Sequence, residues 1–334
     1  MASASEWTNI VRVDRARAAK DAAYARSFST SGPCFCVYDE RFAKDILGNS
    51  PKIKRIEQRD YQFAHEAGLY IKRTNSVYFT ANFQTCDPVD LYAIDSGTHA
   101  IKKLDYPDVV QANGACNYQD KVLYCSQGDK STPSSLVLVD PVTEKSEVLI
   151  NNFQGREFNS INDVVIHHKT GDIWFTDPTY GYEQAFRPAP QLPCQVYRFR
   201  PSTHECWVVA DGFEMCNGLC FDPQYKKLYV TDTGAIQAHN GPGDGHQFSF
   251  DPGNRRPYMF PDGIKCDANG YVYSGCGDGV HVWDPQGTLV GKIIVGNMTA
   301  NFNFVKDGVW MFNEHVLYFV GLKAKGALVH IECE

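Results

Sequence analysis

A short segment with an aromatic residue between two mostly apolar ones recurs along the chain, and such segments are typical of strand cores. A second apolar strand-like run follows each copy. Successive copies are 37 to 55 residues apart, which fits one four-stranded sheet per repeat. The six copies are VYF, LYC, IWF, LYV, VYS and VWM, centred on Tyr78, Tyr124, Trp174, Tyr229, Tyr273 and Trp310; the runs that follow are LYAID, LVLVD, QVYRF, HQFSFDP, VHVWDP and VLYFV.

These units cannot bury both of their faces alone, so they must stack on one another. Radial stacking protects the strand edges and is favoured over an open solenoid. The repeat therefore predicts an all-β, six-bladed β-propeller over residues 32–334, preceded by an extension over residues 1–31 that is partly helical or flexible. We expect the run CFCVY at 34–38 to close the ring by completing the last blade.

Composition limits the classes of function. The net charge of −7 comes without a basic run, which argues against a nucleic-acid or anionic-membrane partner. No window reaches 18 consecutive apolar residues, and the start lacks the apolar core of a secretory signal, so we expect a cytoplasmic protein with no obligate protein partner. A mitochondrial presequence is the alternative for the Ala- and Arg-rich start, although Glu6, Asp14 and Asp21 oppose it. The 12 cysteines form no CxxC pair and are expected to be reduced thiols.

An oxygen-bearing side chain lies 11 or 12 residues before five of the six aromatic residues. If the repeats are equivalent, these five side chains share one level around the axis and converge at a mouth of the central channel. Carboxylate and amide oxygens suit a hard divalent cation, Ca²⁺ first, with Mg²⁺, Mn²⁺ or Zn²⁺ left open; the absence of His and Cys from the register disfavours Zn²⁺. The five residues are Glu66, Asn113, Asn162, Asn217 and Asp262.

The same dipeptides have a simpler interpretation. Asn113, Asn217 and Asp262 each precede a glycine, and such dipeptides are common in turns. Glu66 and Asn162 have no following glycine, and turn propensity does not explain a register shared by five repeats. The metal site is therefore the preferred hypothesis.

At these residues the chain resembles the gluconolactonase and regucalcin (senescence marker protein-like) family. The motifs that carry the resemblance are HEAG at 65–68, NSINDVV at 159–165, WFTDPTYG at 174–181, CNGL at 216–219 and PDG at 261–263. The resemblance implies a six-bladed propeller that binds one divalent cation and opens lactones. It implies that Glu66, Asn217 and Asp262 are metal ligands, that Asn162 is a further ligand or a substrate contact, and that Asn113 contacts substrate. Ser160 stands where regucalcin has an arginine, which argues against sugar-acid lactones that need that arginine.

An axial cation could polarise a lactone carbonyl while a water attacks it. The resemblance makes Asp262 the first choice of catalytic base, with metal-bound hydroxide as the alternative. Asp163 is expected to orient the ligands from behind. The Pro-rich run 181–194 is expected to wall the pocket, with Phe186 and Arg187 contacting the small-molecule substrate. His65 is expected to be a packed histidine.

Metal-dependent lactone hydrolysis is the leading functional hypothesis. A non-hydrolytic enzyme of specialised metabolism could use the same pocket for ring opening, isomerisation or cyclisation, and a lactone panel without turnover would favour it. A binding propeller stabilised by its cation is the non-enzymatic alternative. A strictosidine-synthase-like role is disfavoured because that chemistry uses no metal.

Overall fold

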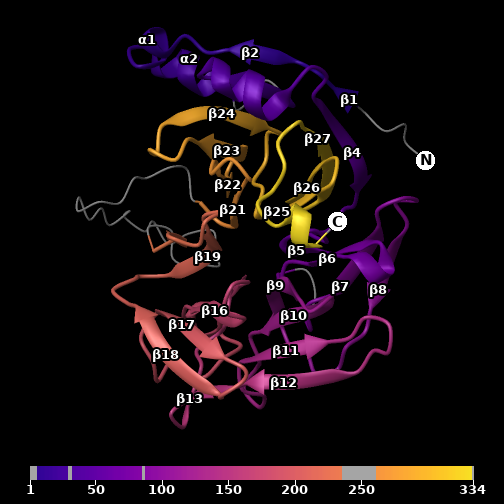
Figure 1. Ribbon diagram of the computed structural model, residues 1–334, viewed down its shortest axis with the longest axis vertical. Coiled ribbons are helices and arrows are strands. Elements are labelled where there is room, and N and C mark those ends of the chain that lie inside the picture. The colour runs from indigo at the N-terminus through magenta and orange to yellow at the C-terminus, as the bar shows by residue number, and fades with distance from the viewer. Residues whose placement is uncertain (1–5, 29–31, 85–86, 235–260, 333–334) are drawn as a thin grey trace.

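The computed structural model describes residues 6–28, 32–84, 87–234 and 261–332. Its sheets stand around a common axis, and the chain passes once round the ring from β5 to β27 (Figure 1). Three consecutive sheets are four-stranded antiparallel meanders, as the repeat of short strands predicts. They contain β5 (Glu66–Ile71), β6 (Ser76–Thr80), β7 (Leu91–Asp95) and β8 (Ile101–Leu104); β9 (Ala112–Tyr118), β10 (Lys121–Ser126), β11 (Ser135–Val139) and β12 (Ser146–Ile150); and β15 (Val164–His167), β16 (Asp172–Asp177), β17 (Gln195–Arg200) and β18 (Glu205–Ala210).

Two further sheets join strands from both ends of the chain. In one, β24 pairs with the N-terminal β3, which pairs in parallel with β2; in the other, β27 pairs with β4, which pairs with β1. The first contains β21 (Ile264–Cys266), β22 (Val272–Cys276), β23 (Gly279–Trp283), β24 (Leu289–Ile294), β3 (Cys34–Val37) and β2 (Ile10–Arg12), and the second contains β25 (Asn301–Val305), β26 (Gly308–Asn313), β27 (Val316–Gly321), β4 (Lys52–Gln58) and β1 (Glu6–Trp7).

This arrangement corrects the predicted closing strand. Residues 34–37 do join a blade that is otherwise C-terminal, but it is the blade of β21–β24. The last blade is completed by β4, which runs antiparallel to β27 with Lys52 opposite Gly321. The expectation failed because β4 has the sequence KIKRIEQ and is half exposed, so it carries no apolar signature of a strand.

The number of blades also differs from the prediction. The described residues hold five complete blades rather than six. Between β18 and β21 they hold a sheet of two strands only, β19 (Cys216–Phe221) and β20 (Leu228–Asp232). The expected strand HQFSFDP that follows in sequence lies outside the described residues.

Six inner strands nevertheless encircle the axis. Each contacts the next in the order β5, β9, β15, β19, β21 and β25, and β25 contacts β5 again. All six run in the same sense along the channel, so their first residues gather at one mouth. The level of a side chain in the channel is therefore set by its distance from the start of its inner strand.

The repeated aromatic residues form the core between the blades. Tyr124, Tyr273 and Trp310 are almost fully buried, and rings of neighbouring strands stack, as Phe79 does on Phe312 at 5.3 Å between centroids. Burial of such rings is the main stabilising contribution in a sheet-on-sheet core.

The remaining elements are short. Asp14 and Asp21 cap the first two helices by accepting hydrogen bonds from backbone N–H groups of the first turn. No helix in the described part of the chain has the length and apolar character needed to span a membrane. The short helices and strands outside the blades are α1 (Arg15–Ala18), α2 (Ala22–Ser27), η2 (Phe42–Leu47), η3 (Lys72–Thr74), α3 (Tyr180–Glu183), α4 (Val329–Glu332), β13 (Asn152–Phe153) and β14 (Arg156–Glu157).

Candidate functional site

The five residues of the oxygen register lie at the beginnings of five inner strands. Glu66 is the first residue of β5, and Asn113 and Asn217 are the second residues of β9 and β19. Asn162 and Asp262 lie two residues before β15 and β21. Because these strands run in the same sense around the axis, the structure brings all five residues to one mouth of the channel. Four of them are buried, and Asn113 is half-buried.

Hydrogen bonds from three equivalent threonine hydroxyl groups hold the register residues at this level. Thr80, Thr176 and Thr231 lie on the second strands of their sheets, each two residues after the repeated aromatic. Their Oγ1 atoms donate to backbone carbonyl groups on the next inner strand, and Thr176 donates to the Asn217 carbonyl at 2.7 Å. The other two acceptors are the carbonyl groups of Asn113 and Asp262. The recurring threonine is visible in the sequences VYFT, IWFT and LYVT, a signal that could have been read with the register.

The glycines that follow the register residues allow neighbouring strands to approach closely. A Cβ on Gly114 would lie 2.5 Å from the Asn162 carbonyl oxygen, and one on Gly218 would lie 2.7 Å from the Asp262 carbonyl oxygen. The dipeptides at 113–114 and 217–218 lie within β9 and β19. Their glycines are therefore needed for the packing of the channel wall, and the alternative that these dipeptides form turns is wrong.

Two buried carboxylates, Glu66 and Asp262, interact at this mouth. Burial raises the pKa of Asp262 well above its usual range, and the negative charge of Glu66 raises it further. Burial likewise raises the pKa of Glu66, although the Asn301 amide donates a hydrogen bond to its Oε2 at 2.9 Å. Without a cation, the pair is an electrostatically unfavourable arrangement that a positive charge would relieve.

Three buried oxygen atoms at this mouth have no hydrogen-bond partner among the described residues: Oδ1 of Asn113, Oδ1 of Asn162 and Oδ1 of Asp262. Buried polar atoms are nearly always satisfied, so such a group of oxygens suggests a missing ligand. Two carboxylates with amide oxygens match the donors of a hard divalent cation. Within the described ranges, no group of three or more His, Cys, Asp or Glu residues is placed to hold a metal, so any cation here must use the amides as well.

Asn301 and Tyr180 are neighbours of the register that the sequence did not reveal. Asn301 is the first residue of β25, whereas the register position before Trp310 is Thr299. Tyr180 begins α3, outside the repeat; its hydroxyl accepts a hydrogen bond from the Asn217 amide at 3.1 Å and contacts the Thr233 hydroxyl.

His65 is paired and not merely packed. Its Nδ1 lies 2.7 Å from Oε1 of Glu314, whose other oxygen accepts a hydrogen bond from Asn82 at 3.3 Å. Burial opposes a charge on the ring, but Glu314 outweighs it and raises the pKa of His65 to about 10. The imidazolium adds a positive charge behind Glu66 and lowers the pKa of that carboxylate in turn.

Asp163 links two inner strands. Its Oδ1 accepts from the Val164 amide at 2.9 Å, and its Oδ2 accepts from the Leu219 amide at 3.2 Å. Both oxygens are therefore engaged with backbone, and the residue fixes β15 against β19 directly beside Asn162.

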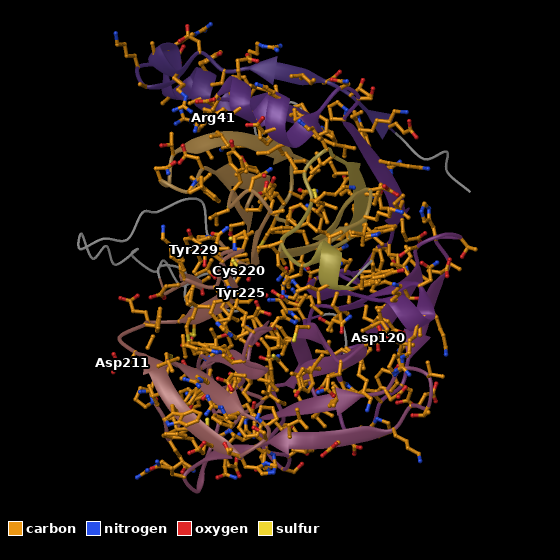
Figure 2. The ribbon with its side chains drawn as sticks, viewed as in Figure 1. Arg41, Asp120, Asp211, Cys220, Tyr225 and Tyr229 are labelled. Atoms are coloured by element: carbon orange, nitrogen blue, oxygen red, sulfur yellow. The ribbon has the colours of Figure 1, made fainter. Side chains whose placement is uncertain are left out.

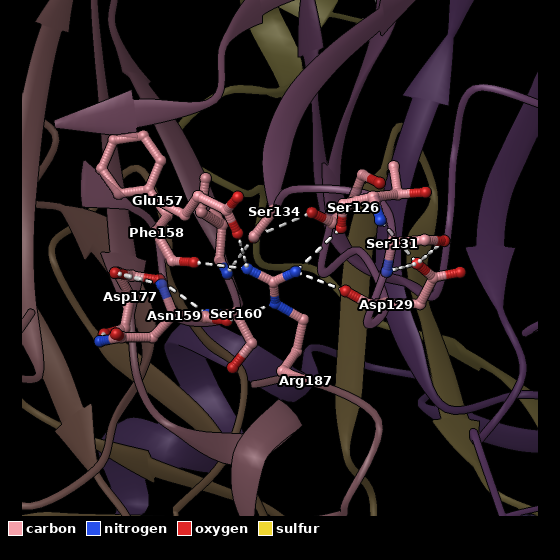
Figure 3. A network of polar contacts seen from close by, with 12 residues as sticks. Ser126, Asp129, Ser131, Ser134, Glu157, Phe158, Asn159, Ser160, Asp177 and Arg187 are labelled. Atoms are coloured by element: carbon pink, nitrogen blue, oxygen red, sulfur yellow. Dashed lines mark hydrogen bonds and ion pairs between the residues drawn. The ribbon is translucent and has the colours of Figure 1, made fainter. Parts of the chain in front are cut away.

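Arg187 and Phe186 occupy different environments. The Arg187 guanidinium is buried and donates to four backbone carbonyl groups and to Glu157 (Figure 3). It holds the run 181–194 against the segments around residues 129–132 and 157–159, so we assign it this structural role in place of the expected substrate contact. Phe186 is only partly buried and packs beside Phe83, with ring centroids 6.1 Å apart.

Comparison with known proteins identifies relatives of this chain. Residues 65–312 match the family described as SMP-30/Gluconolactonase/LRE-like region. The lactonohydrolase oryL of Aspergillus oryzae is 31% identical over 319 residues, which cover 83% of this chain and 71% of that protein. The gluconolactonase of Zymomonas mobilis is 29% identical over 53% of this chain and 54% of that protein.

Solved structures support the propeller fold. A putative gluconolactonase superposes with a TM-score of 0.70 at 24% identity, covering 87% of this chain and 98% of that one. A calcium-binding protein, regucalcin, from Agrobacterium tumefaciens superposes with a TM-score of 0.58 at 15% identity, covering 81% and 94%. The family match spans the inner strands and every residue of the oxygen register. This chain is therefore a β-propeller that belongs to the SMP-30/gluconolactonase/LRE-like family.

Proposed function

We propose that this protein hydrolyses a lactone at the channel mouth where the oxygen register lies. The observation that carries the proposal is the set of three unpartnered oxygens beside the buried pair of Glu66 and Asp262. The names of the relatives, lactonohydrolase and gluconolactonase, support the choice of a cyclic ester as substrate.

We further propose that one divalent cation, Ca²⁺ first, is held by Glu66, Asn162, Asn217 and Asp262. Carboxylate and amide oxygens are its preferred ligands, and the calcium-binding regucalcin shares the fold. When bound, the cation would supply Lewis-acid polarisation of the ester carbonyl. We also propose that β19 and β20 are the inner strands of a sixth blade, because β19 fills the sixth position around the axis.

The chain's own residues would position the reactants. Asp262 would take the proton of the attacking water, since its Oδ1 accepts no hydrogen bond from any described residue. Asn113, whose Oδ1 is equally unpartnered, would contact the substrate. Phe186 and Phe83 would form an apolar side of the entrance, which favours a lactone with an apolar substituent.

The test uses a panel of aliphatic, aromatic and sugar-acid lactones and follows the protons that their hydrolysis releases. The protein is first treated with a chelator, and the rate is measured before and after Ca²⁺ is added back. We expect Ca²⁺ to restore hydrolysis, and we expect Asp262→Asn and Glu66→Gln each to lower kcat/KM by about a hundredfold or more. Asp60→Asn, at an exposed position, is the matched control and should leave the rate unchanged.

Different failures point to different alternatives. Cation binding with no turnover on the panel would replace hydrolysis with a non-hydrolytic reaction or a binding role. Full hydrolysis in chelator by the wild type and by Asp262→Asn would reject both the cation and the assigned base.

A further inference from the structure

A cavity of about 350 Å³ lies at the end of the inner strands opposite the oxygen register. Residues from all six inner strands line it, and its wall is mostly apolar, with Leu69, Val165, Leu219, Phe221 and Phe304 among the lining side chains. Leu328 and Val329, at the start of α4, line it from the side of the C-terminus. The short yellow helix lies near the middle of the ring in Figure 1, and Cys220 and Tyr225, which also line the cavity, are labelled near the middle in Figure 2.

Two hydrogen-bond donors in this cavity have no partner among the residues that the structure describes. Asn303 is 6% exposed, and its Nδ2 makes no hydrogen bond within that part of the chain. Lys265 is partly buried, and its ammonium makes no hydrogen bond or ion pair with any residue that the structure describes. Leaving such donors unsatisfied next to an apolar wall is unfavourable, so both groups favour an acceptor that enters the cavity.

The other polar groups of the lining are already engaged. The Asn117 amide donates to the Tyr70 carbonyl at 2.9 Å, and its oxygen accepts from the Asp120 amide. Asp222 accepts from the backbone of the segment 226–227. The Lys169 ammonium donates to the Gln224 carbonyl at 2.8 Å. The charge of Lys265 acts at a distance on Asp163 and Glu66, but Lys265 and Asn303 remain the donors that an acceptor in the cavity would engage.

Size and lining define the ligand. A cavity of about 150 Å³ accommodates the six carbons of benzene, so 350 Å³ accommodates roughly 14 non-hydrogen atoms. Lys265 and Asn303 would bind a carboxylate through charge-assisted hydrogen bonds, and the apolar wall would bury a hydrocarbon body. We propose that this cavity is a second binding site, distinct from the oxygen register, for a small carboxylate with an apolar tail.

The experiment titrates sodium nonanoate into the full chain in the presence of a chelator, with isothermal calorimetry as the measurement. We expect saturable binding at one site per chain. Lys265→Met keeps the length of the side chain but removes its charge, and should weaken binding about tenfold or more, because a charged hydrogen bond contributes about 1.5–3 kcal/mol. Lys130→Met, at an exposed position outside the lining of the cavity, is the matched control and should change the affinity by less than about twofold.

Two further ligand and variant comparisons distinguish binding in this cavity from binding of the tail alone and from binding at the oxygen register. 1-Nonanol has the tail without the charge and should bind about tenfold more weakly than nonanoate. Asp262→Asn alters only the opposite mouth and should leave nonanoate binding unchanged. Asn303→Leu should weaken binding severalfold, and circular dichroism melts would establish that each variant is folded.

The proposal is overturned if the wild type shows no saturable binding, if nonanoate and nonanol bind equally, or if Lys265→Met binds like the wild type. Loss of binding in Asp262→Asn would place the ligand at the oxygen register instead. Should Lys265→Met fail to fold, Ala327→Phe keeps the lysine but fills part of the cavity. Undiminished binding to Ala327→Phe would then reject the site.

Discussion

Arg187 shows how one buried cation can organise irregular backbone. Its side chain is 3% exposed, and its donors satisfy carbonyl groups of residues that belong to separate loops. A buried charge is tolerated only when it is hydrogen-bonded in this way. The run 181–194 is therefore held in place by a side chain whose donors are all engaged with backbone carbonyl groups and Glu157.

We predict that Arg187→Met lowers the free energy of unfolding by about 3–5 kcal/mol, because it leaves several buried carbonyl groups without donors. Urea denaturation measures the change. Arg12→Met, which removes an exposed ion pair with Glu40, should change stability by less than about 1 kcal/mol. A variant of Arg187 that keeps full stability but has a raised KM would instead support the substrate contact expected from sequence.

Asp177 makes stability depend on pH. Both of its oxygens accept backbone hydrogen bonds at 2.9 Å, from Asn159 and Ser160, but burial dominates and raises its pKa to about 7. Since the folded state then binds a proton more tightly than the unfolded state, this group's contribution to stability falls as pH rises from about 4 to about 7.

We expect the free energy of unfolding of the wild type to fall relative to that of Asp177→Asn as the pH rises over that range. The relative fall should be up to about 1.4 kcal/mol per pH unit. Urea midpoints at pH 5, 6 and 7 for both proteins provide the comparison, because the remaining titrating groups are shared. Parallel pH profiles would show that Asp177 keeps an ordinary pKa in the folded protein.

The positions of the register residues could be predicted from sequence because each inner strand and its partner form a hairpin of nearly constant length. A side chain outside that repeat leaves no such signal. Asn301 lies off the register, and Tyr180 reaches Asn217 from α3, a helix that has no counterpart in the described parts of the other blades. The pairing of His65 with Glu314 joins residues from the two ends of the ring and needs the closed fold to exist.

At the scale of elements, the outer strands are where prediction from sequence fails. Most inner and second strands are largely buried and therefore recur as apolar patterns, although β20 is mostly half-buried. An outer strand such as β4 is half exposed, and its alternating sequence specifies neither its partner nor its blade. Both β3 and β4 are outer strands supplied by the N-terminal segment, so the ring closes through two successive blades.

We predict different consequences for two truncations. Removal of residues 1–31 deletes β1, β2, α1 and α2 but leaves β3 and β4. The chain should fold with a Tm lowered by several degrees, because Cys34, Cys36 and Ile294 lose the apolar cover that the deleted segment provides. Removal of residues 1–58 also exposes the edges of β24 and β27, and should give insoluble protein. Soluble yield and circular dichroism melts decide; an unimpaired 59–334 fragment would refute closure by these strands.

At the scale of the whole molecule, the channel has chemically different ends. One is lined by buried carboxylates and amide oxygens, and the other is mostly apolar with donors in excess. Burial raises the pKa of Glu66, and the charge of Lys265, acting from the second end, offsets a part of that rise. The six inner strands would thus support the two proposed sites, which differ in electrostatic preference, on one axis.

The carboxylate end should make the whole fold sensitive to cations. We predict that Ca²⁺ at about a hundred times its Kd raises the free energy of unfolding by about 2.7 kcal/mol. Asp262→Asn should abolish this gain, yet it should be more stable than the wild type in chelator at pH 8, because it removes one of two repelling buried charges. Thermal melts with and without Ca²⁺ measure both effects. An Asp262→Asn protein that is less stable than the wild type in chelator, and that Ca²⁺ still stabilises, would contradict the ligand assignment.

The pairing of β4 with β27 can form only late in translation. β4 leaves the ribosome among the first strands, but its partner is made about 260 residues later, which at 5–20 residues per second is a delay of roughly 13 to 52 s. During that interval Ile53 has Trp7 of β1 beside it but lacks Val320 of β27, and the first and the most recently made blades each lack a neighbour on one side. The nascent chain therefore depends on whatever shields this segment until translation is almost finished, so yield in cells should be limited by the closing step more than by the stability of the finished ring.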